Sequence, residues 1–293
     1  MSKRRKPAQS TAPKTPKTRD AFVPRPFDGL ADETEWIALR ELVPAATAPL
    51  KLAADVIEQY GDRDVLLSTV LPMAWPAMTK PDGRIFIGLQ RHVQSGDVSR
   101  DIAVAILRAL ESTPGEPVSV PALPGIGPRL QDILVDGSLD ITMQDGFEYW
   151  LDEGAADDPE VASSLERANS SIYPTIRMAA AHAAYWCQVP DRAHMRWVLA
   201  EDEDQALDAL ARLSAAGDLL LGDSTKFAGM FRALGRLVPV WDLPMNVPGV
   251  EWEEPLAALA KRYADAISPP GTALTSEERR ARQGLIGRQI TLR

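Results

Sequence analysis

A regular alternation of short apolar runs and amphipathic stretches between residues 194 and 243 constrains the fold most. The runs HMRWVLA, DLLLG and LVPVWDL have the length of strands. The stretches between them, DEDQALDALARLSAAG and STKFAGMFRALGR, carry apolar residues at helical spacing. Strands that alternate with helices over short connections are typical of a parallel sheet. We therefore predict a small parallel β-α-β-α-β unit over 194–243, followed by a helix in EEPLAALAKRYADAI.

The residues before position 158 show a different pattern. TAPLKLA, DVLLSTVLP and GRIFIGLQR are short, apolar or alternating runs bounded by turn signals, which predicts strands. ADETEWIALREL and SGDVSRDIAVAILRALES have helical spacing, and Asp97 or Ser99 is suited to cap the second helix. Two alternating runs flank Asp145-Gly146 and predict a hairpin. This half is expected to form a mainly antiparallel sheet with helices.

The fold class that follows is a mixed α+β and α/β chain. DPEVASSLERANSS and YPTIRMAAAHAAYW are predicted helices between the two halves, and no internal repeat is apparent. A chain of 293 residues suits two domains better than one. The predicted divisions are a basic arm at 1–25, an α+β lobe at 26–158, a helical plus α/β lobe at 159–268, and an Arg-rich C-terminal tail at 269–293.

Composition favours a soluble cytoplasmic protein with no membrane contact. The one cysteine, Cys187, excludes an internal disulfide framework and fits a reducing compartment. No apolar run approaches the ~20 residues of a membrane span, and the charged N-terminus lacks the apolar core of a signal peptide.

Charge is distributed unevenly along the chain. Residues 1–25 carry eight bases and one acid, a net of +7, so the remainder of a chain with net charge −9 must carry −16. The arm has almost nothing to bury, which predicts disorder over residues 1–20. It is interpreted either as a weak contact with RNA, DNA or the ribosome or as a solubilising tail. The candidate nucleic-acid contacts are Lys3, Arg4, Arg5, Lys6, Lys14, Lys17 and Arg19.

The stretch PALPGIGPRLQDIL resembles the turn of a helix-hairpin-helix module, which grips a nucleic-acid backbone. Such a module needs a helix on both sides of the Gly125-Ile126-Gly127 turn, but Pro114, Pro117 and Pro121 oppose the first helix. Residues 131–160 contain ten acids and no base, so the local field repels phosphate. The sequence therefore favours a structural turn here.

Two further groups of residues bear on chemistry. Ser224, Thr225 and Lys226 follow a predicted strand and open a predicted helix, whose N-terminus either binds an anion or is simply capped. His182, Cys187 and His194 are close in sequence, but their spacing matches no standard zinc pattern, and nothing in the sequence activates the thiol. No metal site, no cofactor and no catalytic residue is predicted.

Several phrases carry a resemblance to a known family, among them LRELVPAATAPLKLA, TVLPMAWPAM, AAYWCQVPDRAHMRWVLAEDEDQALDALARL and ERRARQGLIGRQITLR. Together they resemble a family of uncharacterised actinobacterial proteins known as a domain of unknown function, over about residues 22–293. The resemblance implies a cytoplasmic protein of a high-GC organism, in agreement with 24 arginines and eight lysines. It implies no catalytic residues.

Three functions remain open on this basis. The favoured one is a non-catalytic adaptor that binds a protein partner, and a flat apolar patch on a body without pockets would support it. The second is an enzyme or small-ligand-binding protein, with a site between the lobes or at the strand ends of 194–243. A pocket with perturbed acids or histidines would support that alternative. The third is nucleic-acid or ribosome association through the arm.

Overall fold

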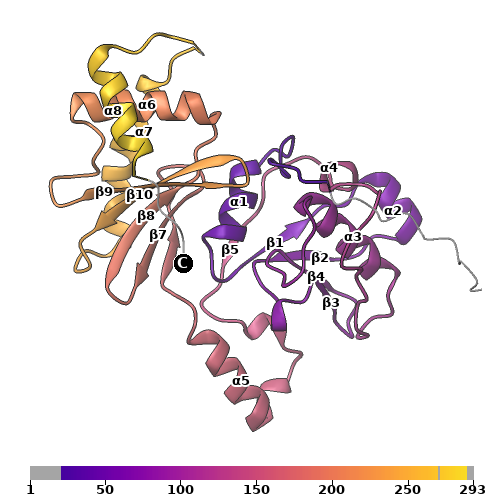
Figure 1. The fold of residues 1–293 in the computed structure, drawn as a ribbon. Helices are drawn as coiled ribbons and strands as arrows, with labels where there is room; N and C mark the ends of the chain where they lie inside the picture. Colours follow the sequence, from indigo (N-terminus) through magenta and orange to yellow (C-terminus); the bar gives the residue numbers. More distant parts are fainter. Residues whose placement is uncertain (1–20, 270, 289–293) are drawn as a thin grey trace, which may run out of the picture.

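The computed structural model describes residues 21–269 and 271–288 and contains two five-stranded sheets with helices packed against them (Figure 1). The predicted α+β class is confirmed. The predicted disorder of residues 1–20 and the seven candidate nucleic-acid contacts lie outside the described residues. We call residues 21–158 the N-terminal lobe and residues 159–288 the C-terminal lobe, while the predicted domain boundaries themselves stay a prediction.

The N-terminal sheet has the strand order β3-β4-β2-β1-β5. Its strands are β1 (Ala46–Leu50), β2 (Val65–Ser68), β3 (Ala77–Thr79), β4 (Ile85–Gly88) and β5 (Thr142–Met143). β2 and β4 pair in parallel, and the other neighbours are antiparallel. The mainly antiparallel character was predicted. The predicted hairpin around Asp145-Gly146 is wrong, because β5 pairs with β1 and a 3-10 turn, η2 (Glu148–Trp150), follows it.

Two helices of this lobe were predicted from the sequence, over ADETEWIALREL and SGDVSRDIAVAILRALES. The helices of the lobe are α1 (Glu33–Glu41), α2 (Ala54–Tyr60), α3 (Val98–Glu111) and the single turn α4 (Leu130–Ile133), with the 3-10 turn η1 at Pro72–Ala74. α3 buries an apolar stripe against the sheet, and the side chain of Asp97 caps it by accepting from the backbone N–H of Arg100. The turn η3 (Ala155–Asp157) and α5 (Pro159–Asn169) connect the lobes, and Figure 1 shows α5 projecting from the body.

The C-terminal sheet has the order β6-β7-β8-β10-β9, and all its neighbouring strands are antiparallel. They are β6 (Thr175–Arg177), β7 (Ala184–Val189), β8 (Arg192–Trp197), β9 (Lys226–Ala233) and β10 (Arg236–Leu243). The predicted parallel β-α-β-α-β unit is therefore wrong. So is the helix predicted over YPTIRMAAAHAAYW, which forms β6 and β7.

Tight turns explain the error. Leu234 and Gly235 have φ values of 45° and 85°, so they reverse the chain directly between β9 and β10. The stretch STKFAGMFRALGR is consequently a strand and its turn, although its apolar spacing also fits a helix. DLLLG forms no strand; Leu219 and Leu221 are buried beneath β10 as part of a loop.

Three helices cover the outer face of the C-terminal sheet: α6 (Glu203–Ala216), α7 (Glu253–Ala266) and α8 (Ser276–Ile286), with the 3-10 turn η4 (Gly249–Trp252) before α7. The predicted polar C-terminal tail thus contains a helix. Arg282 on α8 holds α6 through Asp204 at 2.6 Å and Asp208 at 2.8 Å. Leu285 is buried in the same contact.

One arrangement occurs three times in the chain: a β-hairpin followed by a helix. The units are β3-β4-α3, β7-β8-α6 and β9-β10-α7. No repeat is apparent in the sequence. α3 packs on its own hairpin, whereas α6 packs on β10 and on α7 and α8.

The two lobes share one hydrophobic core. The cluster beneath the N-terminal sheet contains Ile37, Leu67 and Ile106, and it continues into Val238 and Val240 on β10. A second cluster, between the C-terminal sheet and its helices, is centred on Trp241 and Leu256. The C-terminal sheet is therefore packed on both faces, by its own helices and by the N-terminal lobe.

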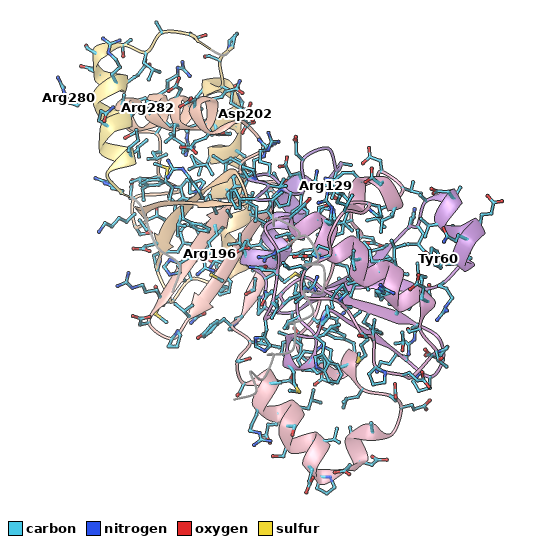
Figure 2. All side chains as sticks on the ribbon, turned by 45° about the vertical axis from the view of Figure 1, so that its right-hand side comes forward. Tyr60, Arg129, Arg196, Asp202, Arg280 and Arg282 are labelled. Carbon is cyan, nitrogen blue, oxygen red and sulfur yellow. The ribbon has the colours of Figure 1, made fainter. Side chains whose placement is uncertain are left out.

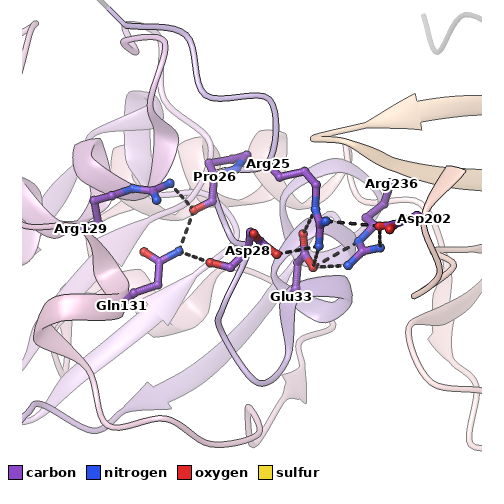
Figure 3. Close-up of polar contacts among 8 residues, drawn as sticks. All are labelled: Arg25, Pro26, Asp28, Glu33, Arg129, Gln131, Asp202 and Arg236. Atoms are coloured by element: carbon purple, nitrogen blue, oxygen red, sulfur yellow. Dashed lines mark hydrogen bonds and ion pairs between the residues drawn. The ribbon is translucent and has the colours of Figure 1, made fainter.

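Buried charges on the first turn of α1 reinforce this contact (Figure 3). Glu33 accepts hydrogen bonds from Arg236 at 2.6 Å and from Arg25 at 2.8 Å, and Asp202 contacts both arginines. Glu35 is fully buried and accepts from Tyr185 at 2.5 Å and from Arg177 at 2.9 Å. Arg25, which the sequence places in the free arm, thus belongs to the junction of the lobes.

We predict that Glu33→Ala destabilises the protein by about 3 kcal/mol, because it leaves the buried Arg236 without its main partner. Denaturant unfolding monitored by circular dichroism measures the change. Glu58→Ala is the control, since Glu58 is exposed on α2, and it should change the unfolding free energy by less than about 0.5 kcal/mol. Equal effects of the two substitutions would contradict the role of Glu33.

The difference in unfolding free energy between wild type and Glu33→Ala depends on pH. Burial alone would raise the pKa of Glu33, but the hydrogen bonds and charges of Arg25 and Arg236 lower it below its usual value. The stabilisation from Glu33 is therefore complete above a pH of about 4.3, the value of an unfolded glutamate, and disappears as the pH falls through the lowered pKa. A stability difference between wild type and Glu33→Ala that grows on acidification would contradict this.

Candidate functional site

One row of polar residues crosses all five strands of the C-terminal sheet. In the strand register, Thr175 on β6 pairs with Cys187 on β7, Cys187 with His194 on β8, His194 with Asp242 on β10, and Asp242 with Lys226 on β9. Residues that are directly opposite on neighbouring strands project from the same face of the sheet. The five side chains therefore form a continuous polar row on one face.

Alternation along each strand explains why this face is polar. Trp186, Met195, Trp241 and Phe227 occupy the intervening positions and lie in the core beneath the covering helices. The polar row faces the other way, toward the N-terminal lobe. Here the two lobes do not close completely, and Figure 2 shows Arg196 at the junction between them.

The polar row lines a cleft of about 1120 Å³ between the lobes. The N-terminal lobe supplies the opposite wall from Glu41–Pro44, at the C-terminal end of α1, and from Gln90, after β4. Arg192 and Arg196 extend the C-terminal wall on either side of His194. Its volume is that of a site for a small organic molecule.

His194 and Asp242 lie at the centre of the row. Nδ1 of His194 is 3.0 Å from Oδ1 of Asp242, although the two atoms are not aligned as a hydrogen bond. Burial lowers the pKa of His194, the charge of Arg196 lowers it further, and Asp242 acts in the opposite direction. The imidazole is therefore neutral at pH 7 and offers one donor and one acceptor.

Cys187 lies beside His194 but is not an activated nucleophile. Burial raises the pKa of the Cys187 thiol, and the nearby charge of Arg196 offsets this only in part. The thiolate is the reactive form of cysteine. Cys187, His194 and Asp242 thus share a face without forming the activated set that thiol catalysis needs.

Two cations of the cleft have no acidic partner among the described residues. Arg196 is half-buried, its Nε is buried without a hydrogen-bond partner, and no described carboxylate lies within 4 Å of its guanidinium. Lys226 is exposed and likewise forms no ion pair with a described residue. Glu41 is bound by Arg40, and Asp191 lies 3.8 Å from Arg192, but the neutral His194 leaves the charge of Asp242 in place. Arg196 and Lys226 therefore exceed the unpaired acid of the cleft by one positive charge, in a body of strongly negative net charge.

The predicted helix N-terminus at Ser224–Lys226 is absent, because Lys226 begins β9. Thr225 instead closes a turn, donating from Oγ1 to the carbonyl of Gly222 at 2.7 Å. Anion binding by Ser224 and Thr225 stays a prediction, and Lys226 alone of the three lines the cleft. Within residues 21–269 and 271–288, no group of three or more His, Cys, Asp or Glu side chains could hold a metal ion.

The Gly125-Ile126-Gly127 turn lacks the preceding helix that a helix-hairpin-helix module needs, since residues 112–129 contain no helix. Gly125 has a φ of 73° and Ile126 is fully exposed. Arg129, the base of this segment, is occupied internally. It donates to the carbonyl of Pro26 at 2.9 Å (Figure 3) and to Asp97 at 3.3 Å. The geometry agrees with a structural turn.

Comparison with protein families identifies the chain. Residues 26–293 match the model of a family described as "Family of unknown function (DUF5926)". The chain belongs to DUF5926. This confirms the expected membership of a family of unknown function, and the match spans both lobes and every wall of the cleft. No curated protein and no solved structure matches the DUF5926 chain.

The sequence of the DUF5926 chain contains one signal that points to the cleft, the turn between β7 and β8. Pro190-Asp191 is a turn dipeptide, and a two-residue loop there places Val189 opposite Arg192 and Cys187 opposite His194. From the sequence, Cys187 and His194 were considered only as a metal site or as nucleophile and base, and Arg196 and Asp242 were missed. Asp242 meets His194 only through the pairing of β8 with β10, across 48 positions of the chain.

We predict that the His194 imidazole of this DUF5926 protein titrates below the ordinary value of about 6.5. Arg196→Met should raise the pKa of His194, because it removes a repelling charge, and Asp242→Asn should lower it further. NMR titration of the imidazole protons measures both shifts, with His194→Gln used to assign the signal. A midpoint above 6.5, or one that Arg196→Met leaves unchanged, would contradict this electrostatic description.

Proposed function

We propose that the protein binds a small anionic ligand in the cleft between its lobes. The unpartnered guanidinium of Arg196 carries the proposal. A half-buried arginine without an acid is costly, and a carboxylate or phosphate group of a ligand would provide the charged hydrogen bonds that the described residues do not.

The other residues of the row suit the same ligand. Lys226 adds a second cation on the adjacent wall, and the neutral His194 together with Thr175 can bond to uncharged polar groups. Positive charge within a cleft of a negatively charged body concentrates anions at that place. This supports the ligand-binding alternative of the sequence analysis, with binding rather than catalysis as the activity.

An adaptor role is the other function considered, and it calls for an apolar contact surface. Among the described residues, the large apolar side chains with strong exposure, such as Met73 and Ile126, lie in loops and 3-10 turns. None of these residues belongs to an α-helix or a β-strand. The cleft is the better-supported site, so we rank ligand binding first and adaptor function second.

The proposal retains the expectation of a cytoplasmic protein, since Cys187 is a free, buried thiol. Every helix in the described part of the chain is too short or too polar to cross a lipid bilayer.

We predict that inorganic pyrophosphate or citrate, used as probes, binds to the full chain in isothermal titration at constant ionic strength. Arg196→Ala should weaken binding by about 10- to 100-fold, which corresponds to the loss of charged hydrogen bonds worth about 1.5–3 kcal/mol. The control is Arg280→Ala, because Arg280 is exposed on α8 far from the cleft (Figure 2). Arg280→Ala should bind the probes with the same affinity as wild type.

Two results would contradict the proposal. One is the absence of binding by both probes, and the other is equal loss of affinity in Arg196→Ala and Arg280→Ala. The second would indicate general attraction of anions to surface arginines rather than a site.

A further inference from the structure

A second concave site lies at the outer edge of the N-terminal sheet, where β3 is the last strand (Figure 1). This groove, which we call the β3 groove, has a volume of about 520 Å³. Its walls are the β3 segment Trp75–Pro81, the segment Gly115–Val118, and the side chains of Trp150 and Asp152. It shares no lining residue with the cleft.

We propose that the β3 groove binds an extended, cationic, proline-containing peptide, and that residues 1–20 of this chain are that peptide. The sequence of residues 1–20 contains seven bases, one acid and three prolines, at positions 7, 13 and 16. A segment of this composition cannot build a core of its own and gains contacts only on another surface.

The outer edge of β3 is unpaired but covered. The N–H of Lys80 donates to Arg84 at 2.8 Å, and the carbonyl of Pro76 accepts from Gly88 at 3.1 Å, so these residues face β4. Strand alternation then directs the N–H and C=O groups of Ala77 and Thr79 away from the sheet. No described residue forms a backbone hydrogen bond with them on that side. However, Ala77 and Thr79 are only 3% and 5% exposed, and Oγ1 of Thr79 donates to the carbonyl of Glu116 at 3.0 Å, so the segment after α3 shields this edge. A peptide in the groove therefore contacts mainly the side walls.

Prolines bracket this edge and limit its use. Pro76 and Pro81 stand at either end of the three-residue strand, and proline cannot donate to a ladder. Together with the cover from the segment after α3, the prolines leave almost no backbone of β3 for pairing, which guards against association of strands. A peptide that itself contains prolines, and makes few backbone hydrogen bonds, fits this restriction.

The side walls are suited to proline rings. Trp75 is 44% exposed at the groove, and Trp150 and Pro117 line it as well. Grooves lined by aromatic side chains are the usual receptors of proline-rich segments. Met73 and Ala74, directly before Trp75, have φ values of 53° and 50°. Non-glycine residues are strained in this region, and such strain concentrates at ligand clamps.

Charge favours a cationic occupant. Two carboxylates, those of Glu116 and Asp152, line the groove against one cation, Lys80. Lys80 is buried and already lies 3.0 Å from Asp152, while no described cation pairs with Glu116. Trp150 and Asp152 belong to the segment 131–160, which contains ten acids and no base. The seven bases of residues 1–20 are the complement of this surface.

The chain is long enough to reach the groove. Val23 donates to the carbonyl of Gly96 at 2.8 Å, so the described chain begins near the N-terminal end of α3. The 14 residues of α3 span ~21 Å, and its C-terminal end leads to Gly115–Val118. Twenty residues span up to ~66 Å when extended. Docking within one molecule therefore requires only part of the segment.

The test uses a labelled synthetic peptide with the sequence of residues 1–20, and fluorescence anisotropy measures its affinity for two proteins. One is the full chain and the other is the chain without residues 1–20. Intramolecular docking competes at an effective concentration on the order of millimolar. We therefore expect the peptide to bind the truncated chain at least tenfold more tightly than the full chain.

Substitutions in the truncated chain locate the site. Trp75→Ala should weaken peptide binding at least tenfold, and Glu116→Lys at least threefold, with a smaller dependence on salt. Glu58→Lys, an exposed charge reversal on α2, is the matched control and should leave affinity unchanged. Trp75 is on an exposed loop, and circular dichroism verifies that each variant folds. Arg196→Ala should leave peptide affinity unchanged, which separates this proposal from the cleft.

Three results would overturn the proposal that residues 1–20 bind the β3 groove. They are the absence of binding to the truncated chain, equal affinity of the full and truncated chains, and equal affinity of Trp75→Ala and its parent. A full chain that forms dimers, combined with a monomeric truncated chain, would assign the peptide to the groove of a second copy instead.

Discussion

The buried acids on the first turn of α1 determine how the two lobes fit together. Glu35 is fully buried against Tyr185 and Arg177, and Glu33 is buried against Arg236 and Arg25. Removing one member of such a set leaves an uncompensated charge away from water, which is far more costly than losing an exposed ion pair. Because the acids belong to one lobe and most of their partners to the other, few relative positions of the lobes satisfy them.

The position of the cleft follows from this fit. Near α1 the C-terminal sheet presents Val238 and Val240 to the N-terminal lobe, and the shared core closes over them. Farther along the same face the strands carry the row from Thr175 to Lys226, which is polar and cannot join an apolar core. The lobes therefore separate over the polar row, and Arg196 lies at the boundary between closed core and open cleft. An anion held there would contact a wall whose geometry the α1 charges maintain.

Much of the fold could be predicted from local patterns. α1, α3, α6 and α7 and the strands β1, β2, β4, β8 and β10 lie where apolar periodicity predicts them. The error over β9 has a physical cause: its apolar spacing satisfies both helix and strand, and the Leu234-Gly235 turn decides between them. A parallel arrangement was inferred from the mistaken helix, so one local error changed the whole sheet. The YPTIRMAAAHAAYW stretch fails similarly, because its run of alanines favours a helix locally while the hairpin with β8 requires a strand.

The candidate site was less accessible from the sequence than the fold. Cys187 and His194 were noticed for their proximity in the chain, but proximity across a hairpin, rather than ligand spacing, gives them a common face. Glu33 and Glu35 stand early in the predicted helix ADETEWIALREL, where its spacing does not mark them as buried. Their partners, at positions 25, 177, 185 and 236, are brought to them by the tertiary structure, which no periodicity in α1 could indicate.

Native-state hydrogen exchange tests most directly the central claim that the lobes form one cooperative unit around the α1 charges. The slowest-exchanging amides of β4 and of β10 report on the two sheets separately. A shared core and shared buried charges predict that both sets exchange with the same opening free energy, and that Glu35→Gln lowers both by the same amount. Exchange of the β10 amides through an opening of lower free energy, with the β4 amides still protected, would contradict the account.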